Sequence, residues 1–408
     1  MQSVKITIEG DYIDCQIYRG RLYLWAFDGS LRVYKWNELV ESLVADQANL
    51  LAMTYCFLES SYIYDYYLTK LFLDEDFKKL LIRKFETIGG EGFQLTEDQA
   101  ANFLIKQQDT PGKLLPTDTE IYGNTLYYIN ETGLYSTGAH RYGKLSNPVS
   151  SRPSKLWDCR LLSIKANKYP QIALSAGEDG LFEFNKIDRA PITLPKADTL
   201  FPIYKISEGH SSFANYSFLS IYNTSLISQS YMALFTWNMN SKESSSKRAT
   251  RDFQRTVPDN FIFRSGIETD HISWGIQDKI YRATDTGFEI VKFDNGNGER
   301  EPQWSQLDFI NLRPWKGKVI GGSAAHFGTI VECENALVIM LSDGQVMTIA
   351  GPITRWRVYP RSNNYENQLH VILDDKIEIY SFNQDYFVNQ ENKEFGIEFI
   401  ADLHKNRP

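Results

Sequence analysis

Apolar and polar residues alternate along the stretch from Ile17 to Trp36, and two pairs of turn residues interrupt the alternation. The interruptions are Arg19-Gly20 and Asp28-Gly29. Strict alternation is typical of a strand with one buried face, and Asp-Gly between two such runs indicates a tight turn, because glycine accepts the positive φ that the turn needs. This stretch therefore predicts a β-hairpin.

The hairpin pattern recurs with a constant spacing between an apolar anchor residue and a turn glycine. The interval of seven residues occurs four times, at Leu22 and Gly29, Leu126 and Gly133, Ile280 and Gly287, and Leu337 and Gly344. Less regular copies are anchored at Ala173 and Leu369, and the run Tyr216–Trp237 is a seventh candidate. A tyrosine directly follows three anchors, at Tyr23, Tyr127 and Tyr281. We expect these three rings to pack between repeat units.

Repeated short strands with a turn in each unit predict small sheets that bury their faces only against neighbouring sheets. Stacking such sheets radially leaves few exposed edges. In these features the chain resembles the β-propeller superfamily and is WD40-like in a divergent form, although its only Trp-Asp pair, Trp157-Asp158, is predicted to open a strand. The resemblance implies an all-β fold, a single β-propeller of about seven blades. Six blades remain an alternative, because the step from Leu337 to Leu369 is short for a four-stranded blade.

The predicted propeller spans residues 1–400 and is closed by the N-terminal strand Val4–Ile8. This strand is expected to pair near Ile377–Phe382 or Gly396–Ile400, which joins the two ends of the chain and removes an open edge. Residues 401–408 are predicted to form a loose tail.

A helical insertion is predicted at residues 61–110, within the propeller. Asp74, Glu75 and Asp76 precede the apolar residues Phe77, Leu80, Leu81 and Phe85 at helical spacing, and Gly89-Gly90 is expected to end this helix. Thr96-Glu97-Asp98-Gln99 is a capping box that predicts a second helix through Leu104 and Ile105. Before the insertion, Asn37 is predicted to cap a helix that reaches Val44, and Leu50–Leu58 is predicted to be a strand.

Two hydrophilic segments are candidate contact sites for a partner. Inserted helices leave the ring at a loop, where binding surfaces are common, although they also serve as structural cover. The stretch Asn238–Arg255 has a local charge excess of +3, and it is interpreted either as a solvated loop between blades or as a contact for phosphate or an acidic partner. The candidate partner-binding residues are Asp74, Asp76, Phe77, Lys78, Arg83, Lys247, Arg248 and Arg251.

Composition and motifs disfavour several function classes. A formal net charge of -8 argues against nucleic acid as the main ligand. The four cysteines have no metal-binding or redox spacing and are expected to be buried thiols, and the six histidines are dispersed. No nucleophile elbow, phosphate-binding loop or dinucleotide fingerprint is found. The sequence therefore indicates no catalytic residue, metal or cofactor. It also contains neither a signal peptide nor an apolar run long enough to span a membrane, which makes a cytoplasmic location the default.

The sequence favours a non-enzymatic protein-interaction module that scaffolds, docks or sequesters a partner protein through propeller-face loops and the helical insertion. One alternative is a propeller enzyme of hydrolase or lyase type with a site in the central channel. Another is weak binding of nucleic acid through the basic stretch. The sequence predicts no oligomeric state.

Overall fold

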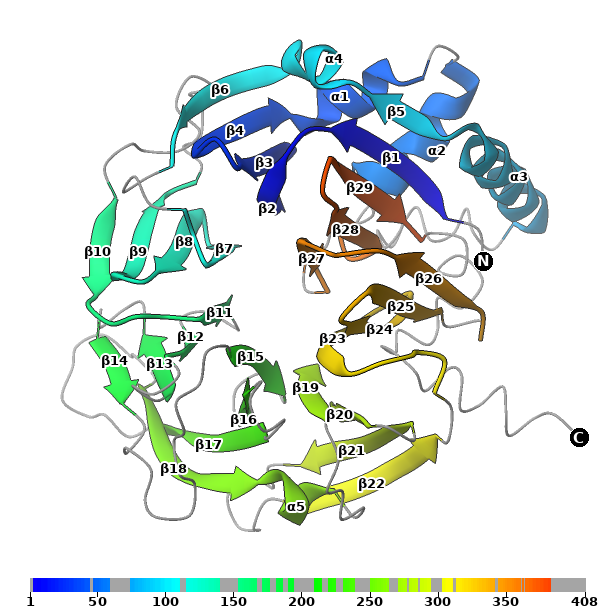
Figure 1. The fold of residues 1–408 in the computed structure, drawn as a ribbon. Helices are drawn as coiled ribbons and strands as arrows, with labels where there is room; N and C mark the ends of the chain where they lie inside the picture. The colour runs from blue at the N-terminus through cyan, green and yellow to red at the C-terminus, as the bar shows by residue number, and fades with distance from the viewer. Residues whose placement is uncertain are drawn as a thin grey trace, which may run out of the picture.

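The computed structural model of this chain arranges seven β-sheets around a ring, with one strand of each sheet near the centre (Figure 1). The structure describes residues 3–44, 47–58, 74–110, 115–139, 153–166, 171–176, 181–185, 190–193, 209–214, 219–224, 230–238, 250–263, 271–276, 279–284, 287–294, 303–310, 313–341, 344–360, 362 and 364–382.

One sheet joins the N-terminal strand to the last strands of the described chain, and we call it the closing sheet. Its order is β27 (Arg355–Val358), β28 (Gln368–Ile372), β29 (Lys376–Ser381), β1 (Val4–Glu9) and β5 (Phe93–Leu95). β1 runs antiparallel to β29, with Glu9 opposite Lys376, and β5 lies parallel to the other edge of β1. The N-terminal strand thus pairs with the first of the two segments expected from the sequence. The second, Gly396–Ile400, and the expected tail lie outside the described residues.

The other six sheets have four strands each and follow in chain order. The first three are β2 (Tyr12–Tyr18), β3 (Arg21–Ala26), β4 (Ser30–Lys35) and β6 (Leu104–Asp109); β7 (Asp118–Tyr122), β8 (Thr125–Asn130), β9 (Gly133–Gly138) and β10 (Ser154–Trp157); β11 (Ser163–Ala166), β12 (Gln171–Ser175), β13 (Leu181–Asn185) and β14 (Ala190–Thr193).

The last three four-stranded sheets complete the ring. They are β15 (Gly209–Ala214), β16 (Leu219–Thr224), β17 (Ser230–Asn238) and β18 (Thr250–Pro258); β19 (Ile272–Ile276), β20 (Lys279–Ala283), β21 (Phe288–Asp294) and β22 (Gln303–Ile310); β23 (Val319–Ala325), β24 (Gly328–Cys333), β25 (Ala336–Leu341) and β26 (Val346–Ala350). This arrangement is the all-β propeller class predicted from the sequence.

The repeat predicted from the sequence has the expected backbone and packing. The turn glycines Gly29, Gly133, Gly287 and Gly344 have φ values of 85°, 144°, 153° and 83°, which other residues rarely adopt. The three periodic tyrosines are buried and lie in apolar clusters that neighbouring sheets share. The interpretation of these tyrosines as packing between blades is confirmed.

The helices are concentrated between β4 and β6. They are α1 (Trp36–Ser42), α2 (Gln47–Phe57), α3 (Glu75–Glu91) and α4 (Glu97–Ala101), whereas the short α5 (Asp259–Ile262) follows β18. The strand predicted at Leu50–Leu58 is wrong, because this segment belongs to α2. Its short apolar run has no periodicity that separates a buried helix from a buried strand.

The boundaries of the predicted helical insertion are also wrong at both ends. The interruption of the first sheet begins at Trp36 rather than at residue 61, and Leu104 and Ile105 belong to strand β6 rather than to a helix. α1 begins one residue before Asn37, and Lys35 is its N-cap residue. α3 continues through Gly89-Gly90 to Glu91, because the residue with positive φ that ends it is Gly92, at φ 63°.

Two further expectations about strands need correction. Trp157 ends the outer strand β10 instead of opening a strand. Its backbone oxygen lies beside Gly133, and a Cβ added at Gly133 would be 2.1 Å from that oxygen. The stretch Asn238–Arg255 is not simply a loop between blades, because its last residues belong to β18, which pairs with β17 in the same sheet.

One glycine is required by packing rather than by its backbone angle. Gly322 lies on the inner strand β23, and a Cβ at this position would lie 2.3 Å from the indole ring of Trp274 on the neighbouring inner strand. A side chain at position 322 would therefore collide with this ring.

We predict that Gly322→Ala destabilises the protein by about 1–3 kcal/mol, because Trp274 is buried and has no room to move away. Gly90→Ala is the matched control. Nothing lies within 4 Å of a Cβ at Gly90 in α3, so this change should be neutral or stabilise the helix by up to about 1 kcal/mol. Chemical denaturation of the two variants measures both effects, and equal stabilities would contradict the packing argument.

Candidate functional site

The elements α1, α2, α3, β5 and α4, which we call the helical strap, lie along the chain between β4 and β6 of the first sheet. The backbone N–H of Lys35 donates to the carbonyl of Phe103 at 2.9 Å, so the two ends of the strap meet. Between them, the strap reaches across to the closing sheet, where β5 pairs with β1. The strap therefore connects the first sheet with the last one (Figure 1).

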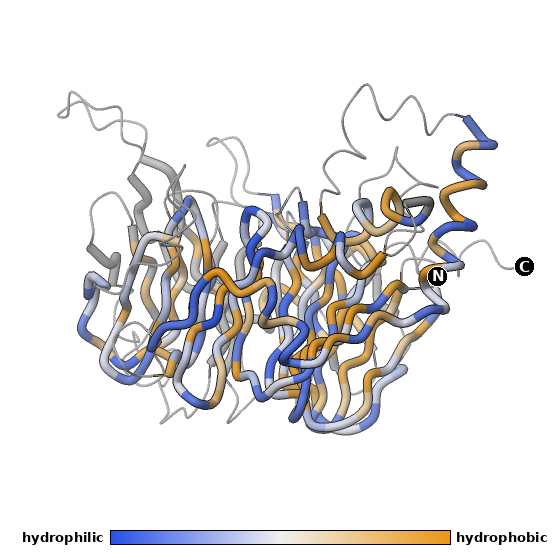
Figure 2. Tube along the Cα trace, turned by 90° about the horizontal axis from the view of Figure 1, so that it is seen from above, coloured by the Kyte–Doolittle hydropathy of each residue, from blue (hydrophilic) through white to orange (hydrophobic). Residues whose placement is uncertain are grey.

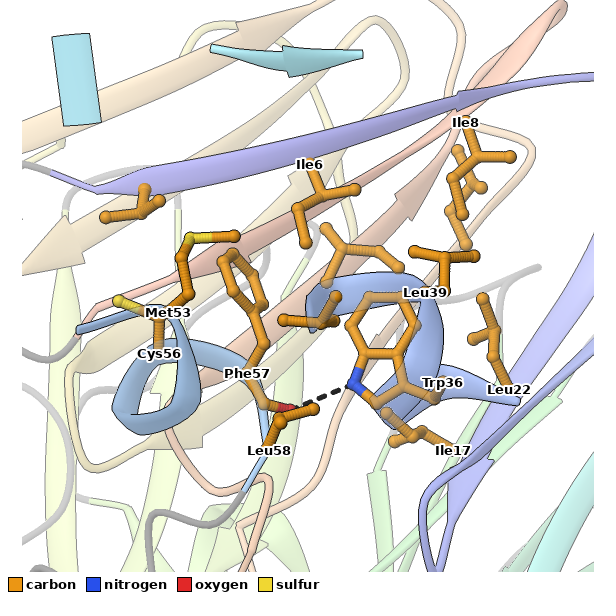
Figure 3. Packing of buried hydrophobic residues seen from close by; sticks show 14 of the residues in the cluster. Ile6, Ile8, Ile17, Leu22, Trp36, Leu39, Met53, Cys56, Phe57 and Leu58 are labelled. Atoms are coloured by element: carbon orange, nitrogen blue, oxygen red, sulfur yellow. Dashed lines mark hydrogen bonds between the residues drawn. The ribbon is translucent and has the colours of Figure 1, made fainter. Parts of the chain in front are cut away.

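Side chains from α1 and from the closing sheet bind the last carbonyl groups of α2. The indole N–H of Trp36 donates to the carbonyl of Phe57 at 2.9 Å, as Figure 3 shows. From the closing sheet, the Gln368 amide donates to the same carbonyl at 2.9 Å, and the Asn367 amide donates to the carbonyl of Cys56 at 2.9 Å. These bonds satisfy acceptors that a helix leaves open at its C-terminal end.

The inner faces of the strap helices belong to one apolar cluster with both sheets. Trp36 and Phe57 meet edge to face, with ring centroids 6.1 Å apart. Around them lie Met53 of α2 and Ile6 of β1 (Figure 3), and Ile379 of β29 belongs to the same cluster. The predicted alternative that the inserted helices are structural cover therefore applies to these inner faces.

α3 is amphipathic, with one face against this cluster. Leu81, Phe85 and Ile88 are its buried residues, and they recur at helical spacing. Leu80 was expected on the same face, yet its side chain is 50% exposed. Figure 2 shows α3 rising beside the ring, with hydrophobic and hydrophilic residues mixed along its turns.

Only part of the predicted contact set on α3 faces solvent. Asp74 is the N-cap, and its carboxylate accepts from the backbone N–H groups of Asp76 and Phe77. Phe77 packs against the apolar cluster. Lys78 forms an ion pair with Glu75 at 2.9 Å. These roles explain Asp74 and Phe77 as parts of the helix and its packing.

The outward face of α3 consists of Asp76, Leu80, Arg83 and Thr87, which are exposed and follow one another at helical spacing. Asp76 and Arg83 belong to the predicted set, whereas Leu80 does not. The exposure of Leu80 could not be predicted from the sequence. The spacing of apolar residues in α3 does not show which side of the helix packs against the ring.

The second predicted contact segment is described only in part. Arg251 lies on β18 opposite Trp237. Lys247 and Arg248 lie outside the described residues.

A buried charge cluster links four inner strands near the centre of the ring. The guanidinium of Arg357 on β27 donates to the carboxylates of Asp14 on β2, at 2.6 Å, and Asp118 on β7, at 2.7 Å. Asp14 also accepts from the hydroxyl of Thr119 at 2.7 Å, and Asp118 accepts from the backbone N–H of Ile164 on β11 at 2.9 Å. Burial alone would raise the pKa of Asp118, but Arg357 holds that pKa below its usual value.

A chain of hydrogen bonds runs from beside this cluster to the strap. The hydroxyl of Tyr359 and the thiol of Cys15 lie 3.4 Å and 3.9 Å from Nδ1 of His370. Nε2 of His370 lies 3.0 Å from the amide oxygen of Gln368, which assigns the proton to Nε2 because that oxygen only accepts. Gln368 then donates to Phe57.

The ionisable groups in this series of hydrogen bonds, His370 and Cys15, are both held uncharged by burial. Burial lowers the pKa of His370 to about 3, so its imidazole is neutral. Burial also raises the pKa of the Cys15 thiol to about 12. Because a cysteine acts as a nucleophile in its thiolate form, the pair Cys15 and His370 has the wrong ionisation for nucleophilic catalysis at neutral pH.

Within the described part of the chain, no group of three or more His, Cys, Asp or Glu side chains is placed to hold a metal ion. Among the same residues, no helix has the length and apolar character needed to cross a membrane.

Comparison with solved structures shows the same fold at low sequence identity. The β-propeller domain of Cps50 (Swd1) from Myceliophteria thermophila aligns with a TM-score of 0.51 and 9% identity, over 91% of this chain and 96% of that one. The computationally designed Ika8 protein aligns with a TM-score of 0.46 and 7% identity, over 94% of this chain and 100% of that one. The first match shows a β-propeller fold, as the sequence predicted. No family model and no curated protein matches the sequence.

We predict that Arg357→Met destabilises the protein by about 3–5 kcal/mol, because it leaves Asp14 and Asp118 buried without their cation. Lys155→Met is the control. It removes an ion pair with Asp158, whose side chain is 89% exposed, so it should change stability little. Urea denaturation compares the two variants, and a similar loss for both would contradict a special role of the central cluster.

We predict that His370 makes the folded state less stable as the pH falls. The folded protein keeps this imidazole neutral down to about pH 3, whereas in the unfolded chain it takes up a proton below about pH 6.5. Stability is therefore present above the unfolded pKa and is lost below it, by about 2 kcal/mol between pH 7 and pH 5. Denaturation at both pH values should show a smaller loss for His370→Gln than for the unmodified protein. Equal losses of stability in the two proteins would show that the folded state does not keep His370 neutral.

Proposed function

We propose that this protein is a non-enzymatic interaction module that docks a partner protein through the outward face of α3. Scaffolding and sequestration of a partner are forms of this function. The partner is a protein, and the proposed module acts in the cytoplasm, as the sequence predicts.

The observation that carries the proposal is the composition of the outward face of α3. Leu80 is a large apolar side chain that is half exposed, between Asp76 and Arg83 on the same side of the helix. An apolar anchor flanked by charges of both signs suits a complementary helix or loop of a partner, because the anchor supplies contact area and the charges set orientation.

The attachment of α3 to the ring also supports docking. Its opposite face is fixed by Leu81, Phe85 and Ile88 in the apolar cluster that includes β1. A binding face on a rigid support loses less conformational entropy when a partner binds. The fold likeness supports a propeller but carries no information about the partner.

The test must leave the strap intact. Deleting residues 61–110 would remove β6 together with α3, so a lost interaction would report only misfolding. We predict that Leu80→Glu combined with Arg83→Glu reduces recovery of a stoichiometric partner by at least about tenfold, because both side chains are exposed and the helix keeps good helix formers. The measurement is affinity purification of the tagged chain from its native host, with quantitative mass spectrometry.

Val346→Glu is the matched control, since Val346 is a similarly exposed apolar residue, at 43%, but lies on β26. The proposal requires the control to keep the partner that the α3 variant loses. Equal recovery with both variants, or no stoichiometric partner with the unmodified chain, would refute docking through α3.

The other two functions stay hypotheses drawn from the sequence. The described residues offer no observation that favours the enzyme alternative over docking. For nucleic acid, the relevant side chains Lys247 and Arg248 lie outside the described residues, so the basic stretch also stays a prediction.

A further inference from the structure

The ring has one place where its two ends meet without a covalent bond. β1 is continuous with the first sheet through Gly10 and Asp11, whereas it joins β29 without a covalent bond, by strand pairing from Val4 opposite Ser381 to Glu9 opposite Lys376. We call this pairing the joint. An open ring would differ from the closed one at the joint and at every contact that crosses it.

The helical strap forms a second connection across the joint. It is covalently part of the first sheet through β4 and β6, and its base is closed by the bond between Lys35 and Phe103. On the other side of the joint, the side chains of Asn367 and Gln368 hold the carbonyls of Cys56 and Phe57. The C-terminal end of α2 is therefore capped by residues from the opposite end of the chain.

The apolar part of this connection is continuous. One buried cluster contains Trp36 and Phe57 from the strap, Ile6 from β1, and Ile377 and Ile379 from β29. Figure 3 shows Trp36, Leu39 and Phe57 of the strap in one cluster with Ile6 and Ile8 of β1. Separating β29 from β1 would expose this cluster to water, which costs free energy in proportion to the apolar area.

The strap also covers the free edge of β1. Residues Phe93, Gln94 and Leu95 of β5 pair in parallel with Ile6, Thr7 and Ile8. The N-terminal strand is thus held on both edges, by β29 on one side and by the strap on the other.

We propose that the helical strap holds the ring closed by stabilising the pairing of β1 with β29. The joint and the strap then open together as one cooperative unit. Loosening the strap releases β1 from β29 even though no residue of the joint has changed. This role does not depend on a partner, and it extends the function of the strap beyond the docking face of α3.

The test is hydrogen exchange, followed by mass spectrometry, on the full-length chain with Phe57→Ala. Phe57 is fully buried in the strap, and its side chain lies in the apolar cluster that includes Ile6 of β1 and Ile379 of β29. We expect exchange in α2, β1 and β29 to rise by a common factor of about ten or more, with β8 and β24 unchanged. Phe184→Ala on β13 is the matched control, because it removes an equally buried phenylalanine from another cluster. It should leave β1 and β29 unchanged.

A milder variant serves if Phe57→Ala does not fold. Gln368→Met keeps the side-chain volume but removes the amide that donates to Phe57, and we expect the same peptides to exchange faster by a smaller common factor.

A disulfide across the joint, which we call the lock, distinguishes opening of the joint from fraying of the strap alone. Glu9 and Lys376 are directly opposite in an antiparallel pair, at a distance that a disulfide spans. In Phe57→Ala carrying Glu9→Cys and Lys376→Cys, the oxidised form should restore slow exchange in β1 and β29, whereas the reduced form should not. The proposal is overturned if Phe57→Ala speeds exchange only in α2, if Phe184→Ala speeds β1 and β29 equally, or if the oxidised lock fails to slow them.

Discussion

Closure of the ring is the constraint on which the rest of this structure depends. Sheets that stack radially bury their faces only when each has two neighbours, so the first and last sheets need each other. This chain meets the requirement with β1, which pairs with β29, and with a segment that returns from the first sheet to cover the other edge of β1. A strand edge that would otherwise be open to other chains is thereby paired.

Polar groups reinforce the same region from the centre of the ring outward. Arg357 joins the innermost strands of three sheets through Asp14 and Asp118. Nearby, the Nε2–H group of His370 donates to the amide oxygen of Gln368, and the amide nitrogen of Gln368 donates to the last carbonyl of α2. Each of these groups is buried and paired, which is the condition under which buried polar groups stabilise a single arrangement. The strap is for this reason better described as part of the ring than as an appended domain, and α3 is available for docking only on its outward face.

The ring was predictable from the sequence because its signals are local. The spacing from Leu22 to Gly29 and its copies reports a turn that only glycine makes easily, and the periodic Tyr23, Tyr127 and Tyr281 report burial between sheets. The capping box at Thr96 and Gln99 was also predictable, and both of its hydrogen bonds are present.

The parts that were not predictable depend on contacts between distant residues. α2 is apolar almost all round, and such a run looks like a buried strand. Gln368 and Asn367 carry no sequence signal for capping a helix more than 300 residues away. For the same reason, the exposure of Leu80 follows from how α3 lies on β1, which periodicity alone does not determine.

Native-state hydrogen exchange of the unmodified protein, measured in increasing low concentrations of denaturant, tests the central claim most directly. If the strap and the joint form one closure, the exchange free energies of α2, β1 and β29 will converge on a single isotherm with the same dependence on denaturant. If α2 exchanges through a separate opening of lower free energy while β1 and β29 stay protected, the ring closes without the strap and the account is wrong.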